Sequence, residues 1–415
     1  MIKRIFSSIL TIAFVFTLVS AMSASASTFT PVTGWDMTQR LGAGITFGNT
    51  TEARAWPWDT GWNPQDTETC WGQPRIERRH LQAAADRGFD SYRLCVTWTP
   101  HIDAEGKISK QWSDRIKQLV DWSLDAGLNV IINTHHEEEL YYMIRDGKYE
   151  DAKKHLSNIW TQVAEQFKNY PETLIFEIMN EPNIKDHYGA DDDKWINDEN
   201  GQVDRTLRET VNKLNADILS IIRASGGNND RRVVMLCVPG AHPDALPYMS
   251  VPENDPYIVL GVFGYDAFIN DDTIPLIQAW LDKGVGVVNK EDAPGSIARK
   301  RISDLESYTK SHFGRLADMG VPSFWFTGSP SPHQLFDRKT REWKNESLLN
   351  AYLAAYEKKS DSEKLTTTDA LNILKSVVGS LTLTAEQFAN YDTNGDGKVD
   401  TADALMILKI VAEGS

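Results

Sequence analysis

Short apolar runs alternate with amphipathic stretches along most of this 415-residue chain. Short apolar runs with polar boundaries predict buried strands, and apolar residues spaced three and four apart predict helices. The expected strands are Leu41–Gly48, Ser91–Trp98, Asn129–His136, Leu174–Asn180, Arg232–Pro239, Ile258–Tyr265, Gly284–Glu291 and Ser323–Ser329. The expected helices between them include Ile76–Arg87, Ser113–Ala126, Ala152–Tyr170 and Gln202–Ser225. Strand–helix alternation repeated eight times predicts the α/β class and a (β/α)8 barrel.

Polar or aromatic residues stand at the carboxyl ends of most expected strands. They are Asn49, Trp98, His135, His136, Asn180, Glu181, Tyr265, Glu291 and Trp325. Core packing does not require such residues there, whereas barrel enzymes place their chemistry at this rim. We therefore expect these side chains to share one site.

The fourth expected strand ends in Asn180-Glu181-Pro182. Pro182 has no N–H and stops the strand, so Glu181 is presented at its carboxyl end. A carboxyl group beside an amide donor suits acid/base chemistry on a sugar. The alternative is a strand-end glutamate that caps a neighbouring helix.

Hydrolysis of a sugar linkage with retention needs a second carboxyl group as nucleophile, because retaining glycosidases use two carboxyl groups about 5–5.5 Å apart. Glu291 follows the apolar run that begins at Gly284 and is the best candidate. The alternative is a rim glutamate that forms an ion pair with Lys290. We interpret His135 and His136 as strand-end hydrogen-bonding residues, since no carboxylate spacing near them supports zinc.

The composition narrows the classes of partner. A net charge of −15 argues against nucleic acid and anionic membranes. The three cysteines, Cys70, Cys95 and Cys237, imply no disulfide framework and show no metal-ligand spacing. Cys95 and Cys237 lie in apolar runs and are expected to pack as small hydrophobic residues.

The first 26 residues have the features of a secretory signal peptide. Lys3 and Arg4 precede an apolar stretch, and Ala24-Ser25-Ala26 provides a small-x-small cleavage site. The apolar stretch is short for a membrane span. We expect a secreted, extracellular protein.

The composition changes after Glu357. We expect a catalytic domain over residues 27–357, a short polar linker over 358–363 and a second module over 364–415. Leu365–Lys375 matches Val399–Lys409 with a period of 34 residues. This duplication predicts a module of two loop–helix units.

A calcium-binding loop precedes the second helix of this repeat. Its oxygen ligands have EF-hand spacing, with a glycine at the sixth position for the sharp turn. The predicted structural Ca²⁺ ligands are Asp392, Asn394, Asp396, Lys398 through its carbonyl group, Asp400 and Asp403. The alternative, a turn without an ion, does not explain why Asp403 opens an apolar helix.

The loop and the duplication resemble a dockerin type I module, over about residues 361–415. The resemblance implies that the chain docks, as a monomer, to a cohesin module of a scaffold protein in a cellulosome. By matching position, the cohesin-recognition residues are Thr401, Ala402, Thr367 and Thr368. The first copy keeps Asp369 but has Lys358, Ser360 and Ser362 at ligand positions, so we expect weak calcium binding or none there. The alternative is a tail that calcium merely stabilises.

Residues 35–355 resemble glycoside hydrolase family 5, in its bacterial endoglucanase and xyloglucanase branch. The motifs that carry the resemblance are Gly44–Thr50, Thr69–Pro74, Tyr92–Trp98, Thr134–Glu137 and Asn180–Pro182. The resemblance implies Glu181 as acid/base and Glu291 as nucleophile, with no catalytic cofactor. It implies supporting and substrate-binding roles for Arg93, His135, His136, Asn180, Tyr265 and Trp325, the last as an aromatic platform beneath the sugar.

The sequence departs from this family at three places near the site. Phe263 stands where the family has a histidine, Lys290-Glu291-Asp292-Ala293 replaces Gly-Glu-Phe-Gly, and Ile45-Thr46 replaces Trp-Asn. We expect Lys290 to lower the pKa of Glu291. Both carboxyl groups remain, so we expect reduced activity rather than none.

The sequence thus predicts a secreted cellulosomal endo-β-1,4-glycanase that acts on plant cell-wall polysaccharides by a retaining double displacement. The β-1,4-linked substrates in view are cellulose, mixed-linkage glucan and xyloglucan. The alternative is a weakened or inactive barrel that binds polysaccharide and docks to the same scaffold.

Overall fold

The computed structural model describes residues 29–54, 64–184, 196–265, 268–293, 302–328, 334–357, 367–381, 383, 387–388, 391–393 and 397–413. The expected signal peptide and linker lie outside these residues. So do two of the predicted calcium ligands, Asn394 and Asp396.

The first part of the chain is a closed barrel of parallel strands, as predicted. Strands β1 to β8 pair in sequence order, and β8 pairs with β1 to close the barrel. The strands are β1 (Ala43–Phe47), β2 (Ser91–Leu94), β3 (Asn129–Asn133), β4 (Leu174–Glu177), β5 (Val234–Cys237), β6 (Ile258–Phe263), β7 (Gly286–Asp292) and β8 (Ser323–Thr327). Each lies within, or within one residue of, an expected apolar run.

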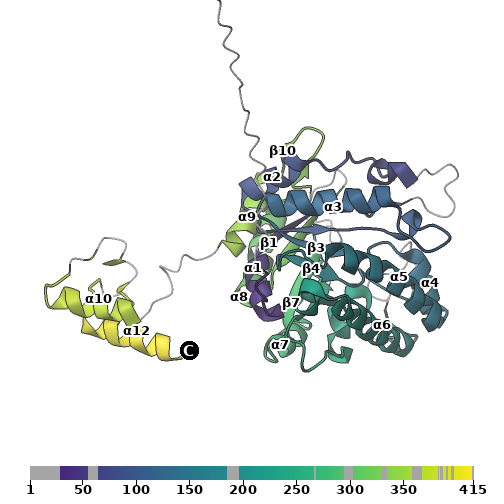
Figure 1. The fold of residues 1–415 in the computed structure, drawn as a ribbon. Coiled ribbons are helices and arrows are strands. Elements are labelled where there is room, and N and C mark those ends of the chain that lie inside the picture. Colours follow the sequence, from purple (N-terminus) through teal and green to yellow (C-terminus); the bar gives the residue numbers. More distant parts are fainter. Residues whose placement is uncertain are drawn as a thin grey trace, which may run out of the picture.

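Helices surround the strands (Figure 1). They are α1 (Gly34–Leu41), α2 (Arg78–Arg87), α3 (Lys110–Asp125), α4 (Glu138–Arg145), α5 (Tyr149–Phe167), α6 (Arg205–Ala224), α7 (Ile274–Leu281), α8 (Ile302–Asp318) and α9 (Glu346–Tyr356). Short 3-10 helices are η1 (Pro64–Thr69), η2 (Thr99–His101), η4 (Gly227–Asp230), η5 (Pro239–Ala241) and η6 (Pro243–Tyr248). The short strands β9 (Phe336–Asp337) and β10 (Glu342–Trp343) form a separate hairpin.

Two apolar layers hold the barrel together. The larger cluster fills the space between strands and helices, and a smaller one fills the barrel interior. Met37 and Leu41 of α1 belong to the inner cluster, so α1 covers the amino-terminal ends of the strands. Along β4, Ile175 lies in this inner layer and Glu177 follows it two residues later. Because strand side chains alternate, the barrel interior becomes polar toward the carboxyl ends.

A β-bulge distorts the end of β7. Val262 of β6 lies opposite Asn289, but the next residue, Phe263, lies opposite Glu291. Lys290 is therefore the extra residue, and the bulge lets two consecutive side chains reach partners inside the barrel. Asp292, which follows, instead contacts His312 of α8 at 2.8 Å.

Helix α9 stabilises the seam where β8 meets β1. The hydroxyl group of buried Tyr352 accepts a hydrogen bond from Gly44 N at 3.1 Å. The same hydroxyl group also contacts the carbonyl oxygens of Gly44 and Ser323. The phenol thus satisfies backbone groups of both strands at the point of closure.

The C-terminal region contains α10 (Thr367–Val377) and α12 (Thr401–Glu413), which pack against each other. Their small core comprises Ala370, Ile373, Tyr391, Ala404 and Ile407. The predicted two-helix module is confirmed. In the described part of the chain, every helix is too short or too polar to cross a membrane.

Candidate active site

Glu181 lies just beyond the carboxyl end of β4. The strand ends at Glu177, and the irregular residues 178–180 carry the chain to Glu181. The backbone N–H of Glu181 donates to the hydroxyl group of Tyr141 at 3.1 Å, and the carbonyl of Pro182 accepts from Gly240 N at 2.7 Å. Glu181 is 7% exposed, so it borders the rim without being solvated freely.

Arg93 of β2 contacts Glu291 and the residue before Glu181. Its Nη1 contacts Glu291 Oε2 at 2.9 Å, and its Nη2 contacts Asn180 Oδ1 at 2.7 Å. Nε and Nη2 also form two 2.7 Å bonds with Glu177. A single buried guanidinium thus positions Glu291 and the residue that precedes Glu181.

Glu291 of β7 has a second fixed partner. The hydroxyl group of Tyr265 donates to Glu291 Oε1 at 2.5 Å. Burial raises the pKa of Glu291 and the nearby charge of Glu181 adds to this, while Arg93 and Tyr265 oppose it. The charge of Glu181 therefore acts on Glu291 within the same site.

The expected effect of Lys290 on Glu291 is wrong. The pKa of Glu291 is raised rather than lowered, and the ammonium group of Lys290 points to Glu177 Oε1 at 2.7 Å. The alternative in which Glu291 pairs with Lys290 fails for the same reason. Burial raises the pKa of Glu177, but Arg93 and Lys290 together hold it below its ordinary value.

Asn180 offers a hydrogen-bond donor to the site. Its side-chain oxygen is fixed by Arg93, so the orientation of the amide is set. Its Nδ2 is buried and has no hydrogen-bond partner in the described structure. Buried amide groups are normally satisfied, so this N–H is available to an oxygen atom of a ligand.

The predicted histidines lie beside one another after β3. His135 is 2% exposed and its Nδ1 lies 3.1 Å from Asn133 Nδ2. The ring of His136 lies 5.4 Å from the ring of Trp71, whose Nε1 donates to Arg54 O at 2.9 Å. His136 and Trp71 are half-buried, which leaves part of both rings open to a ligand.

The fold brings together three side chains that the sequence did not connect as metal ligands. Ligand atoms of Cys95, His135 and Glu291 lie within 4.8 Å of one another. However, Arg93 Nη1 lies 3.3 Å from Cys95 Sγ as well as 2.9 Å from Glu291. A fixed positive charge therefore occupies the region where a metal cation would need to bind.

Trp325 does not form the aromatic platform beneath the sugar that the sequence predicts. Its side chain is fully buried on the outer face of β8, 5.7 Å from Phe313 and 5.4 Å from Tyr352 between ring centroids. The next residue, Phe326, is half-buried and faces the opposite way, against Gly48 at the end of β1. Both faces of a parallel barrel strand are apolar, so the sequence does not reveal which aromatic residue faces the interior.

Two residues of the site, Glu177 and Tyr141, are absent from the sequence predictions, which considered Lys290 only as a neighbour of Glu291. Glu177 had a detectable signal, because a charged residue inside the apolar run of β4 needs a buried partner. Tyr141 and the inward direction of Lys290 had none, since both depend on contacts between distant segments.

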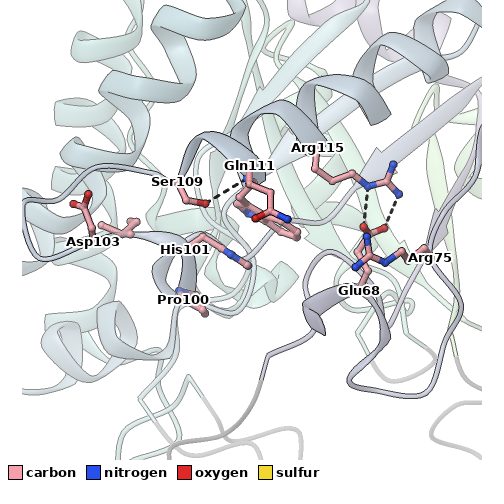
Figure 2. A pocket seen from close by; sticks show the side chains of 10 residues that line it. Glu68, Arg75, Pro100, His101, Asp103, Ser109, Gln111 and Arg115 are labelled. Carbon is pink, nitrogen blue, oxygen red and sulfur yellow. Dashed lines mark hydrogen bonds and ion pairs between the residues drawn. The ribbon is translucent and has the colours of Figure 1, made fainter. Parts of the chain in front are cut away.

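A pocket of about 490 Å³ lies at η2 and α3 (Figure 2). Glu68 pairs there with Arg115 at 2.8 Å, and His101 stacks on Trp112 with ring centroids 3.9 Å apart. None of its lining residues is a predicted catalytic or sugar-binding residue. The pocket and the site at the strand ends are therefore separate features.

Three of the predicted calcium ligands, Asp392, Asp400 and Asp403, take part in hydrogen bonds within the described part of the loop. Asp403 is fully buried, and its two carboxylate oxygens accept from Thr393 N at 3.0 Å and Asp400 N at 2.9 Å. Asp392 Oδ2 accepts from Gly397 N at 2.9 Å. These bonds close the described part of the loop on itself, with Asp403 tied to both Thr393 and Asp400.

The first copy of the repeat differs. Asp369, which corresponds to Asp403, accepts a 2.6 Å hydrogen bond from the hydroxyl group of Tyr391. Thr367, Thr368, Thr401 and Ala402 are exposed at the starts of the two helices.

Comparison with known proteins assigns the barrel. The family model described as Cellulase (glycosyl hydrolase family 5) matches residues 52–348. The chain belongs to glycosyl hydrolase family 5. A second family model, Dockerin type I domain, matches residues 360–412, so this family 5 chain also carries a dockerin domain.

Individual relatives are distant in sequence but similar in fold. The chain is 25% identical to a cellulase/esterase of Acetivibrio thermocellus, covering 91% of this chain and 47% of that protein. It is 27% identical to endoglucanase A of Clostridium longisporum, covering 77% of this chain and 65% of that protein. A solved GH5-4 broad specificity endoglucanase from Clostridium longisporum has a TM-score of 0.69 at 26% identity, covering 79% of this chain and 99% of that one.

Proposed function

We propose that this chain is a secreted retaining endo-β-1,4-glucanase that acts from a cellulosome. The observation that carries the proposal is Arg93, which bonds Glu291 directly and reaches Glu181 through Asn180. One carboxyl group bonded to a buried cation, with a second on the residue after its amide partner, suits glycoside hydrolysis at the carboxyl ends of barrel strands.

The two carboxyl groups divide the chemistry. Glu291 attacks the anomeric carbon, and Glu181 donates a proton to the departing glycosidic oxygen. Glu181 then takes a proton from water, which attacks the glycosyl–enzyme ester and releases Glu291. Tyr265 and Arg93 direct four N–H or O–H bonds toward carboxylate oxygens in this region, and two of them favour the charged, nucleophilic form of Glu291.

The surroundings suit a glucan chain. The unpaired Nδ2 of Asn180 is available to a sugar hydroxyl beside the reacting carbon. His136, Trp71 and Phe326 are aromatic residues that remain partly exposed. Aromatic faces of this kind stack on sugars. We therefore propose soluble β-1,4-glucans, including mixed-linkage glucan and xyloglucan, as substrates.

The C-terminal domain gives the proposed location. Its second loop would bind structural calcium through Asp392, Asn394, Asp396, the Lys398 carbonyl group, Asp400 and Asp403. The exposed residues Thr401 and Ala402, with Thr367 and Thr368, would contact a cohesin module of a scaffold protein. Together with the signal-like N-terminus, this arrangement suits an extracellular monomer docked to a scaffold.

The test is the release of reducing sugar from a panel of soluble β-glycans by the full chain, Glu181→Gln and Glu291→Gln. We expect activity on at least one β-1,4-glucan and a loss of about 10²-fold or more in each variant. Unchanged hydrolysis in either variant would contradict the assigned roles.

A further inference from the structure

Lys290 is a fully buried lysine that the two-carboxylate mechanism does not use. Its ammonium group makes three contacts: 2.7 Å to Glu177 Oε1, 2.5 Å to the carbonyl of Asn180 and 3.2 Å to the carbonyl of Met179. An ammonium group has three hydrogens, so these acceptors use its full donor capacity. The aliphatic chain passes over Gly261, where an added Cβ would lie 2.9 Å from Lys290 Cδ.

Charge balance makes this burial possible. Lys290 and Arg93 form ion pairs with two carboxylates inside the barrel. Both bond Glu177, and Arg93 also bonds Glu291. Two positive and two negative charges therefore compensate one another. The ring of Phe263 lies 5.5 Å from the ammonium group and adds a favourable cation–π contact.

The backbone that Lys290 contacts carries Glu181. Residues 178–180 lie beyond the end of β4 and have no regular strand structure. The carbonyl of Ile178 is fixed from the outside, by Thr134 at 2.8 Å and Trp160 at 3.0 Å. The next two carbonyl groups, of Met179 and Asn180, are fixed from the opposite wall of the barrel by Lys290. The side chain of Lys290 in β7 thereby anchors the segment that follows the end of β4.

We propose that Lys290 is a positioning residue for Glu181 and Asn180, acting through the peptide carbonyls of Met179 and Asn180. Because Lys290 is next to Glu291 in the β7 bulge, the strand that carries the nucleophile also orients the acid/base. The inference rests on the proposed function, since it assigns a role within that reaction.

The substitution Lys290→Met tests this role, because methionine keeps much of the side-chain bulk but has no donor. Two substrates separate the steps. Cleavage of cellotetraose needs a proton from Glu181, whereas 2,4-dinitrophenyl β-cellobioside releases a phenolate that leaves without one. The burst of dinitrophenolate reports attack by Glu291, and its amplitude counts correctly folded sites.

We expect Lys290→Met to lower the kcat for cellotetraose about 10²-fold with little change in KM, as small displacements of a catalytic group do. The burst rate constant should change less than about threefold. Tyr141→Phe, which removes the contact to the N–H of Glu181, should show the same selective loss. Lys283→Met is the matched control. Lys283 is exposed, with its ammonium group 4.1 Å from the ring of Trp280, and both rates should be unchanged in this variant.

Equal losses of cellotetraose turnover and burst rate, or no loss in either, would overturn the positioning role while leaving the proposed function intact. If the unaltered chain turned over neither substrate, the proposed function would fail and the positioning role with it.

Discussion

Tyr265 donates a hydrogen bond that affects the pKa of Glu291, the proposed nucleophile. Burial keeps its own pKa well above the ordinary value, so its hydroxyl group remains a donor to Glu291 at neutral pH. The bond favours the charged form of Glu291 and offsets part of the rise caused by burial. In the proposed mechanism, the charged form of Glu291 therefore depends on this bond together with the one from Arg93.

We expect Tyr265→Phe to raise the pKa of Glu291 further. Glu291 must be ionised to attack, so the acidic limb of the kcat/KM profile should move to higher pH. The loss of one charge-assisted hydrogen bond predicts a fall in kcat/KM of about 10–100-fold near neutral pH. The measurement is kcat/KM against pH on an active β-glucan.

Tyr248→Phe is the control for this change, because Tyr248 is 40% exposed and lies outside the site. Its profile should match that of the unaltered chain. An acidic limb that stays in place or moves to lower pH in Tyr265→Phe would show that the phenol does not stabilise the charged nucleophile.

The strands show which features a sequence determines and which require the fold. Apolar runs predicted every barrel strand, because burial on both faces gives parallel strands an uninterrupted apolar sequence. The same property hid the direction of individual side chains. Trp325 and Phe326 are both aromatic, and only the register of β8 places Trp325 outside. The bulge that turns Lys290 and Glu291 inward together likewise depends on pairing with β6.

The meeting of polar residues from the strand ends could be predicted more reliably than the direction of apolar side chains. Asn180, Glu181, Arg93 and Tyr265 come together as expected, because barrel closure brings all strand ends to one rim. The ion pairs of Glu177 with Arg93 and Lys290 could not be predicted, because they depend on three-dimensional contacts between β2, β4 and β7.

The loop before α12 is the element that we expect to bind calcium. Asp403 closes this loop through bonds to Thr393 and Asp400. We expect Asp403→Ala to abolish calcium-dependent cohesin binding by the full chain, with hydrolysis of soluble glucan within about twofold of normal. Isothermal titration with Ca²⁺, followed by cohesin pull-down with and without chelator, measures both effects.

Asp369→Ala is the matched control, because Asp369 already accepts a hydrogen bond from Tyr391 in the equivalent position. This variant should keep the calcium response of the second loop. Calcium binding that survives Asp403→Ala but disappears in Asp369→Ala would reverse the assignment of the two loops.

For the whole molecule, the proposed function divides catalysis and attachment between the family 5 barrel and the dockerin domain. Catalysis depends on buried charges that are fixed by strands far apart in sequence. Attachment depends on a short repeat whose ligand spacing is visible in the sequence alone. The residue-by-residue assignment of the calcium ligands therefore stays a prediction from spacing, whereas the direction of Trp325 and the partner of Lys290 needed the fold.

The central claim is that Glu291 forms a covalent bond to the sugar. The most direct measurement is mass spectrometry of the full chain after incubation with 2,4-dinitrophenyl 2-deoxy-2-fluoro-β-cellobioside, which slows release of the glycosyl–enzyme ester. We expect one added fluorocellobiosyl group, located on the peptide at Glu291 and missing in Glu291→Gln. Attachment at another residue, or hydrolysis of β-glucan with inversion and no attachment, would contradict the double-displacement assignment.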